Sequence, residues 1–318
     1  MREERTITKH TNTWQIGKVT ITRIVEFEVS GQPPSLILAN VEPEHVKRFN
    51  WLRPHYADDD GQLDFSVHAY VIESEGRRII VDTCVGNDKQ RNLPHFDQLE
   101  GPFLDQLAAA GYPAESVDMV LCTHLHADHV GWNTRLVDGR WVPTFPNARY
   151  LFGRVEWEHW NDENRSSSDV LAHHHDMILS VDNVMADSIR PIVDAGLHML
   201  VETDHRLTTD VCLIPTPGHT PGHVSVRIRS DGEEAIIMGD MIHHPIQIAD
   251  ASIGSLTDVD LAMARTTRQG FLLAHCDQDV LVLGTHFPTP AAGRIVRDEH
   301  GWRLDTSTQL LSTAKEMT

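Results

Sequence analysis

The sequence is poor in cysteine, has fewer basic than acidic residues, and contains no long apolar run. Only four cysteines occur among 318 residues, and three of them lie in or beside apolar segments, so we expect buried thiols and no disulfide framework. No apolar run approaches membrane-spanning length, and the charged residues 1–5 lack the apolar stretch of a secretion signal. The sequence therefore predicts no membrane partner and a cytoplasmic location.

The charge balance excludes another class of partner. Acidic residues outnumber basic ones by 46 to 27, which gives a formal net charge of −19, and the lysines and arginines are scattered. A nucleic-acid partner would need a basic track for its phosphates, so we expect none. With 40% apolar residues, the chain can bury a substantial core, and one large domain with a decorated N-terminus is expected.

A dense cluster of histidines follows the apolar run 117–122. At the end of a strand, residues two apart point the same way, so His124 and His126 can bind one cation together. If the chain then turns into a helix, Asp128 and His129 face a neighbouring position. Imidazole and carboxylate ligands suit zinc best, with iron, manganese or cobalt as further candidates. This segment alone can therefore serve two metals.

Three later segments supply further candidate ligands. Each is a short apolar run followed by a glycine and a residue that can bind a metal: 211–214 precedes His219, 235–238 precedes Asp240, and 280–283 precedes His286. Short apolar runs bounded by glycine are typical of buried strands. We expect these three residues to converge at one rim of a sheet.

In the order and context of these segments, the chain resembles the metallo-β-lactamase superfamily, from about Phe65 to about Leu304. Segments 145–148 and 285–288 are most similar to the branch that holds methyl parathion hydrolase and the acyl-homoserine-lactone lactonases. The resemblance implies two divalent metal ions, most commonly Zn²⁺. It places His124, His126 and His219 on one metal, Asp128, His129 and His286 on the other, and Asp240 between them.

The sequence also predicts the elements of the fold. Residues 1–64 are expected to form an N-terminal extension, with a hairpin (14–17 and 19–27) and an irregular stretch (32–64), and residues 65–318 a catalytic domain. Further strands are expected at 65–72, 78–82, 197–201, 211–214, 224–229 and 235–238, and helices at 102–110, 155–160, 169–181 and 258–275. Two batches of strands, each followed by helices, fit an α/β (α+β) fold, a four-layer αββα sandwich. The resemblance implies that the metals lie at the shared edge of its two sheets.

This ligand set is typical of a metal-dependent hydrolase that acts on a small molecule. Two divalent cations, partly offset by Asp128 and Asp240, can bind a bridging hydroxide near neutral pH, because a metal lowers the pKa of bound water to roughly 7. The branch implies that this hydroxide attacks a lactone, an ester or an organophosphate triester. By analogy with the branch, the extended N-terminus indicates a homodimer.

The residues around the metals carry further expectations. The lactonases have a tyrosine three residues after the bridging aspartate, but this chain has His243 there, which weakens a simple transfer of lactonase activity. We count His243, His244 and Asp128 as catalytic. His243 or His244 would donate a hydrogen bond or proton to the leaving group, and the alternative is a pair that only supports the site. Asp82 is expected to orient a ligand imidazole, and His223 to brace its loop.

Three other functions are alternatives to this hydrolase. A glyoxalase-II-like thioester hydrolase would need a basic patch after His286, where only Arg294, Arg297 and Arg303 occur. An oxygen-reducing diiron protein would prefer glutamate at position 126. A non-catalytic metal-binding member of the fold would tend to lose ligands, and none is missing from the sequence.

Overall fold

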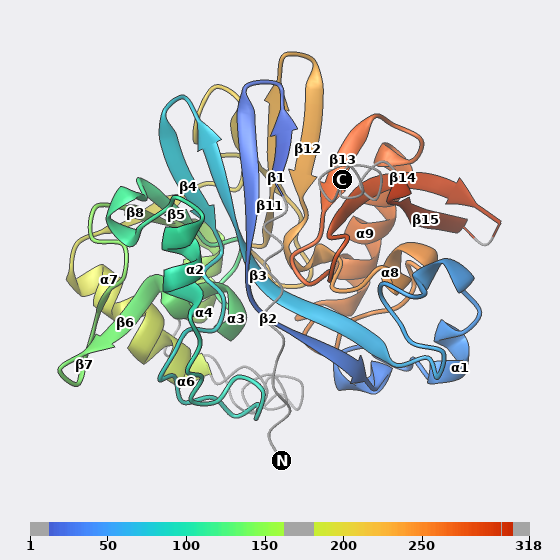
Figure 1. Cartoon of the computed structure of the whole chain (residues 1–318), viewed down its shortest axis with the longest axis horizontal. Helices are drawn as coiled ribbons and strands as arrows, with labels where there is room; N and C mark the ends of the chain where they lie inside the picture. Colours follow the sequence, from blue (N-terminus) through green and yellow to red (C-terminus); the bar gives the residue numbers. More distant parts are fainter. Residues whose placement is uncertain (1–12, 162–180, 300, 308–318) are drawn as a thin grey trace.

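The computed structural model describes residues 13–161, 181–299 and 301–307, and its strands form two large sheets (Figure 1). The seven-stranded sheet has the order β1-β2-β3-β4-β5-β8-β9 and the six-stranded sheet the order β10 to β15. The first sheet contains β1 (Thr13–Ile16), β2 (Val19–Gln32), β3 (Leu63–Ser74), β4 (Arg77–Val81), β5 (Met119–Leu121), β8 (Arg149–Gly153) and β9 (His198–Val201). The second contains β10 (Val211–Pro215), β11 (Val224–Ser230), β12 (Glu233–Ile237), β13 (Val280–Leu283), β14 (Ala292–Asp298) and β15 (Gly301–Asp305). The hairpin β6 (Thr134–Val137) and β7 (Arg140–Pro143) stands apart.

Alternation along the strands divides the apolar residues among three cores. Along β3, Tyr70 and Ile72 belong to the core between the sheets, whereas Ala69 and Val71 face the other way. Successive side chains of a strand point to opposite faces, so a strand buried on both faces is apolar throughout. Residues of β12 and β13 divide in the same manner between the middle core and the outer core of the second sheet.

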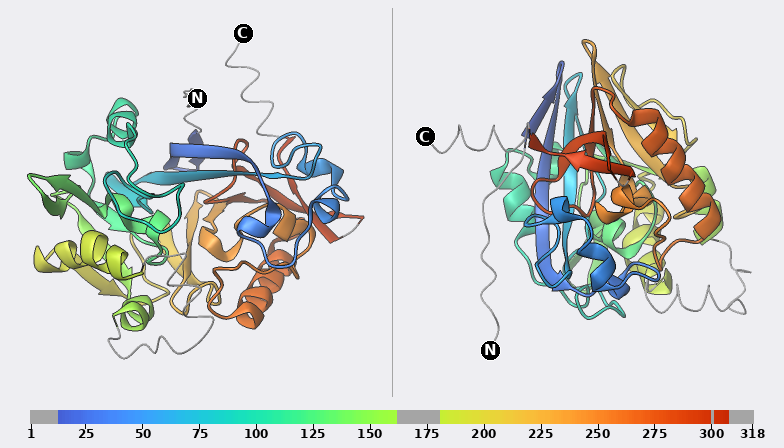
Figure 2. Two further views of the ribbon diagram at one scale, coloured as in Figure 1. Left: turned by 90° about the horizontal axis from the view of Figure 1, so that it is seen from below. Right: turned by 90° about the vertical axis from the view of Figure 1, so that its right-hand side faces the viewer.

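Helices cover the outer face of each sheet and complete four layers. Figure 1 shows α2, α3, α4, α6 and α7 on one flank and α1, α8 and α9 on the other, with both sheets between them. The right-hand view of Figure 2 shows α9 outside the six-stranded sheet. The helices are α1 (Pro43–Val46), α2 (Phe103–Ala109), α3 (Ala127–Val130), α4 (Arg154–Trp160), α6 (Val181–Val184), α7 (Arg190–Asp194), α8 (Ile246–Ala249) and α9 (Leu261–His275). Short 3-10 helices are η1 (Pro34–Leu36), η2 (Asn50–Leu52), η3 (Ala114–Ser116), η4 (Gly131–Asn133) and η6 (Gly239–Met241), and η5 (Met185–Ile189) is a π-helix.

The four-layer αββα arrangement expected from the sequence is confirmed, with corrections at element ends. Strand β2 continues to Gln32, beyond the predicted end at residue 27, because its second half pairs with β3 from Val67 back to Leu63. Helix α9 begins at Leu261, since Asp260 caps it by accepting hydrogen bonds from the amides of Ala262 and Met263. Asp258 is therefore not part of this helix.

Two further expectations concern the limits of the described chain. The predicted helix 169–181 lies outside the described residues except for its last position, Val181, where α6 begins. The three consecutive histidines 173–175, which fall on this predicted helix, also lie outside the described residues. Within the described ranges, no helix combines the length and the apolar composition needed to cross a lipid bilayer.

Candidate metal centre

The histidine-rich segment 124–129 leaves the end of β5 and turns at once into α3. His124 and His126 lie on the connecting loop, and α3 carries Asp128 and His129 on its single turn. All three imidazoles are almost fully buried, whereas Asp128 keeps slight exposure. The turn of the backbone thus separates the segment into two pairs of side chains, as the spacing predicts.

The other three candidate ligands come from the second sheet. His219 lies on the loop between β10 and β11, Asp240 on the turn η6 after β12, and His286 directly after β13. These residues meet the segment 124–129 at the edge shared by the sheets, where their side chains form groups that could hold a metal ion. The predicted convergence of distant strand ends is therefore present in the structure.

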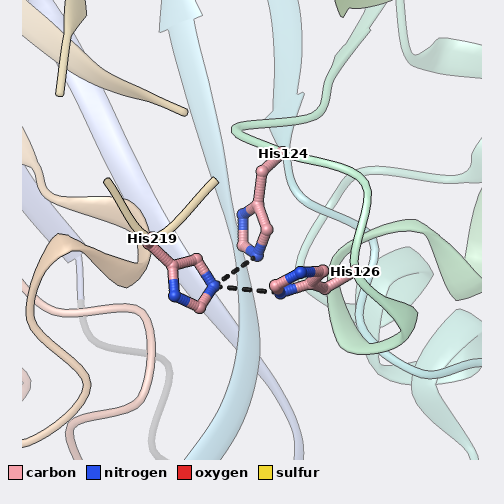
Figure 3. A group of neighbouring side chains, drawn as sticks. All are labelled: His124, His126 and His219. Carbon is pink, nitrogen blue, oxygen red and sulfur yellow. Dashed lines mark hydrogen bonds between the residues drawn. The ribbon is translucent and has the colours of Figure 1, made fainter. Parts of the chain in front are cut away.

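The first group contains three imidazoles (Figure 3). Nε2 of His219 lies 3.2 Å from Nε2 of His124 and 2.9 Å from Nδ1 of His126. Ligand nitrogens of a tetrahedral zinc, each about 2.0–2.1 Å from the metal, are separated by about 3.3 Å. The spacing and the chemistry of these donors fit a cation bound by three nitrogens.

The second group contains Asp128, His129 and His286. Nε2 of His286 lies 3.5 Å from Oδ2 of Asp128, and Nε2 of His129 lies 3.7 Å from Oδ1 of Asp128. Mixed nitrogen and oxygen donors at such distances fit a second divalent cation. The two groups differ in charge, because only the second contains a carboxylate of its own.

Asp240 lies between the two groups, and its carboxylate contacts ligand nitrogens of both. Its Oδ1 is 3.3 Å from Nε2 of His129 and 3.1 Å from Nε2 of His286. Its Oδ2 is 3.3 Å from Nε2 of His286, 3.5 Å from Nε2 of His219 and 3.8 Å from Nε2 of His124. A carboxylate oriented in this way can share its two oxygens between two cations.

Burial and neighbouring charges set the protonation of this cluster. Burial lowers the pKa of His124 well below its ordinary value, and the imidazoles of His129 and His126 lower it further. Burial also opposes a charge on His129, but Asp240, Asp82 and Asp128 outweigh it and raise the pKa of His129 well above its ordinary value. Since imidazole binds a metal in its neutral form, His124 is ready to do so, whereas His129 must release a proton.

Hydrogen bonds orient the ligand imidazoles from behind. Oδ2 of Asp82 accepts a hydrogen bond from Nδ1 of His129 at 2.9 Å, which confirms the contact expected for Asp82. Oδ1 of Asp258 pairs in the same way with Nδ1 of His219 at 3.0 Å. A hydrogen bond of this kind fixes the ring so that its other nitrogen points at the metal. Asp258 had been expected only at a helix start, and no sequence motif marks its contact with His219.

His223 braces two ligand loops, as the sequence predicts, and does not join either group. Its Nε2 accepts a hydrogen bond from the amide of Asp240 at 2.9 Å, and its Nδ1 donates to the carbonyl of Thr216 at 3.0 Å. The imidazole passes so close to Gly239, whose φ is 61°, that a Cβ atom there would lie 2.5 Å from Nε2. Glycine is therefore required at position 239.

The structure separates the two neighbouring histidines 243 and 244. Nε2 of His243 lies 3.1 Å from Oδ2 of Asp240, and its ring lies parallel to that of His286. His244 turns away, where its Nε2 donates to the carbonyl of Tyr56 at 2.8 Å and its Nδ1 accepts from the amide of Ile246 at 3.1 Å. Both ring nitrogens of His244 are thus engaged by the backbone, which favours the supporting role over the expected catalytic one.

Two buried charged residues beside the centre are not predicted by any sequence pattern. Glu156 on α4 contacts both loops that carry the first group, and Arg268 on α9 contacts the segment between Asp240 and Asp258. Neither belongs to a recognisable motif. A charge on an apolar helix face was the only available signal, and by itself it does not identify a partner.

The fold is similar to those of known protein structures. Among solved structures, the fold is similar to hydrolase AbOPH in the beta lactamase superfamily, with a TM-score of 0.78 and 24% identity over 93% of this chain and 96% of that one. It is also similar to AidC, described as a dizinc quorum-quenching lactonase, with a TM-score of 0.75 and 21% identity over 92% and 96% of the two chains. At these identities, the likeness shows the fold.

Curated relatives and a family profile match the sequence itself. An N-acyl homoserine lactonase of Bacillus sp. is 27% identical over 188 residues, which are 55% of this chain, and the chain spans only 63% of that relative's length. The lactonase AiiA of Bacillus thuringiensis subsp. kurstaki is 24% identical over the same shares of both chains. The profile of the Metallo-beta-lactamase superfamily matches residues 63–302. The chain therefore belongs to the metallo-beta-lactamase superfamily.

Proposed function

We propose that this protein is a dinuclear metal-dependent hydrolase that acts on a lactone, an ester or an organophosphate triester. The observation that carries the proposal is the position of Asp240, whose buried carboxylate lies 3.3 Å from Nε2 of His129 in one group and 3.5 Å from Nε2 of His219 in the other. A site built for a single cation would not need a buried carboxylate between two sets of imidazoles. The ligands are His124, His126, Asp128, His129, His219, Asp240 and His286.

The donor set favours zinc, with iron, manganese or cobalt as alternatives. When bound, two such cations would polarise a carbonyl or phosphoryl oxygen and lower the pKa of a water molecule to about 7, which supplies a nucleophile near neutral pH. Asp128 and Asp240 are the only carboxylates among the seven proposed ligands, so two divalent cations bound there would exceed the negative charge of their ligands. The excess positive charge would favour the oxyanion that develops on the substrate.

His243 is the candidate proton donor to the leaving group. It lies on the segment that follows Asp240, and the amide of His243 donates to Oε1 of Gln247 at 2.7 Å, which holds the backbone in place. The side chain is 1% exposed, so water competes little for its hydrogen bonds. A positioned imidazole of this kind accelerates a reaction typically by about 10²–10⁴-fold.

Lactones are the first substrates to test, because the curated relatives are named N-acyl homoserine lactonases. The thioester alternative has less support. It requires free basic residues after His286, but Arg294 pairs with Asp279 at 2.7 Å and Arg303 with Asp305 at 3.5 Å. These pairs involve two of the three arginines after His286, which lowers the positive charge available to the carboxylates of a glutathione-like group.

The test combines metal analysis with a substrate panel. Purified protein is analysed for metal per chain and assayed with γ- and δ-lactones, p-nitrophenyl esters, a paraoxon-type triester, a β-lactam and a glutathione thioester. We expect about two equivalents of metal and turnover of the lactones, esters or triester. Preference for the thioester would favour the glyoxalase-II-like alternative, and bound metal without any turnover would favour a non-catalytic member. We also propose a homodimer, which the molar mass in solution would test.

A further inference from the structure

The carboxylate of Glu156 joins the two loops that carry the first group of imidazoles. Its Oε1 accepts a hydrogen bond from the amide of Leu125 at 3.1 Å, and its Oε2 accepts one from the amide of Gly222 at 3.0 Å. Leu125 lies between His124 and His126, and Gly222 follows His219 by three residues. One side chain on α4 therefore contacts both loops close to the histidines that would bind the metal.

The surroundings of this carboxylate make the contact rigid. Glu156 is 1% exposed, and the indole Nε1 of Trp160, one helical turn later, donates to its Oε1 at 2.5 Å. The ring of Trp160 also contacts the ring of His126, with 5.4 Å between their centroids. Three N–H groups thus donate to the two carboxylate oxygens of Glu156. One of these donors, Trp160, also contacts the candidate metal ligand His126.

The loop of His219 lies directly against the backbone of α4. A Cβ atom at Gly222 would be 2.3 Å from the amide nitrogen of Glu156, which only a shift of the loop could relieve. The close approach and the hydrogen bond to Gly222 together fix the distance between α4 and this loop. Since α4 also holds Leu125, the distance between the two loops is fixed as well.

We propose that Glu156 is a positioning residue for the metal site of His124, His126 and His219. It sets the separation of the two loops and hence the affinity of this site. The site of Asp128, His129 and His286 depends on Glu156 much less, because hydrogen bonds from other elements orient those imidazoles. The inference rests on the metal centre proposed above.

Glutamine at position 156 provides a nearly isosteric test. A carboxylate offers only acceptors, whereas an amide would turn its NH₂ group toward one of the backbone amides and place two donors face to face. The matched control is Glu158→Gln, which makes the same change at an exposed position of the same helix. Metal-free proteins are titrated with zinc against a chromophoric chelator, which resolves the two binding steps.

In Glu156→Gln, we expect one binding step to weaken by about 10–100-fold, the usual effect of removing a residue that orients ligands, while the other step stays within about threefold. Glu158→Gln should match the wild type in both steps. Gly222→Ala displaces the loop without changing the carboxylate, so it should weaken the same zinc-binding step. This variant replaces Glu156→Gln in the test if the glutamine variant does not fold.

Two outcomes would overturn the role of Glu156: unchanged affinity in both steps, or equal weakening of both steps, as a general loss of folding would produce. Failure of the metal centre itself is distinguishable. In that case the wild type would bind fewer than two zinc ions, which contradicts the proposed centre and this role together.

Discussion

At the scale of single residues, the direction of a side chain decides what identical groups do. His243 and His244 are neighbours with the same imidazole and nearly the same burial. One ring lies 3.1 Å from the shared aspartate, and the other is held by backbone groups of Tyr56 and Ile246. Chemical type alone therefore identifies candidates, and the orientation of the ring assigns the role.

The role of His243 predicts a kinetic effect without metal loss. His243→Phe should lower kcat by about 10²-fold or more, the lower range for loss of a proton donor, because the seven proposed ligands remain in place. Metal per chain, measured on the same samples, should not change. The control is His95→Phe at an exposed histidine. Unchanged kcat would contradict the proposed role, and loss of a metal ion would make His243 a ligand instead.

His244 predicts a dependence of stability on pH. Burial lowers the pKa of His244 from 6.5 to about 4, although its hydrogen bond to the carbonyl of Tyr56 opposes the change. The folded protein thus keeps the neutral ring when the unfolded chain already binds a proton. The contribution of His244 to the free energy of unfolding is fully present above pH 6.5 and is lost as the pH falls toward 4. At about 1.4 kcal/mol per pH unit, the total loss is about 3 kcal/mol.

Urea unfolding of metal-free protein at pH 7.5 and 4.5 measures this contribution. In His244→Gln, the free energy of unfolding should fall less between the two pH values than in the wild type, by about 2–3 kcal/mol. The exposed control His95→Gln should fall as much as the wild type does. An equal fall in all three proteins would contradict the assignment.

At the scale of elements, helix α9 holds the segment that carries both Asp240 and Asp258. Arg268, which is fully buried, donates to the carbonyls of Met241 at 3.0 Å, of Ala251 at 3.3 Å and of Ile253. Its guanidinium also lies 3.7 Å from Oδ2 of Asp258, the residue that orients His219. A helix on the outer face of the second sheet thereby supports ligands at the sheet edge.

Removal of this guanidinium should destabilise the fold. Arg268→Met would remove the guanidinium donor from three carbonyls, of which Ile253 keeps a hydrogen bond from Gln247. It would also leave the buried Asp258 without a compensating charge, at a cost of about 3–5 kcal/mol. Chemical denaturation compares this variant with Arg265→Met, a change at an exposed arginine of the same helix. A loss of less than about 1 kcal/mol would contradict the role given to Arg268, since surface changes cost about that much or less.

At the scale of the whole molecule, the metal centre joins the two sheets at their common edge. The first group takes ligands from the loop after β5 in one sheet and the loop after β10 in the other, and Asp240 lies between both groups. Bound cations would therefore link parts of the fold that otherwise meet mainly through the apolar core between the sheets. Metal binding and global stability should be coupled.

Metal removal should consequently lower the melting temperature, and zinc should restore it. Free metal at a thousand times its Kd stabilises the folded state by about 4 kcal/mol for each site. The measurement is a thermal melt of chelated protein with added zinc, and the control is magnesium at the same concentration, because magnesium prefers oxygen ligands. Equal effects of the two metals, or no effect of zinc, would contradict a nitrogen-rich centre.

Much of this architecture could be predicted from local sequence patterns. Apolar runs identified β3, β4, β10, β11 and β12, and turn residues located the hairpins. The two batches of strands, together with the family resemblance, predicted four layers. The spacing of residues 124–129 placed one pair of side chains on the loop after β5 and a second pair on the single turn of α3. Periodicity carries this information because a strand or a helix repeats its geometry along the chain.

The sequence by itself determined the fold class and the seven candidate ligands, since each depends on local periodicity or on residues at the end of an apolar run. Only the tertiary structure decided which neighbour of Asp240 faces it, and which buried charges support the centre. Glu156 meets partners 31 and 66 residues away, and Asp258 meets one 39 residues away. Such contacts lie on loops without a repeating geometry, so the packing of distant segments, and no local pattern, sets the direction of each side chain.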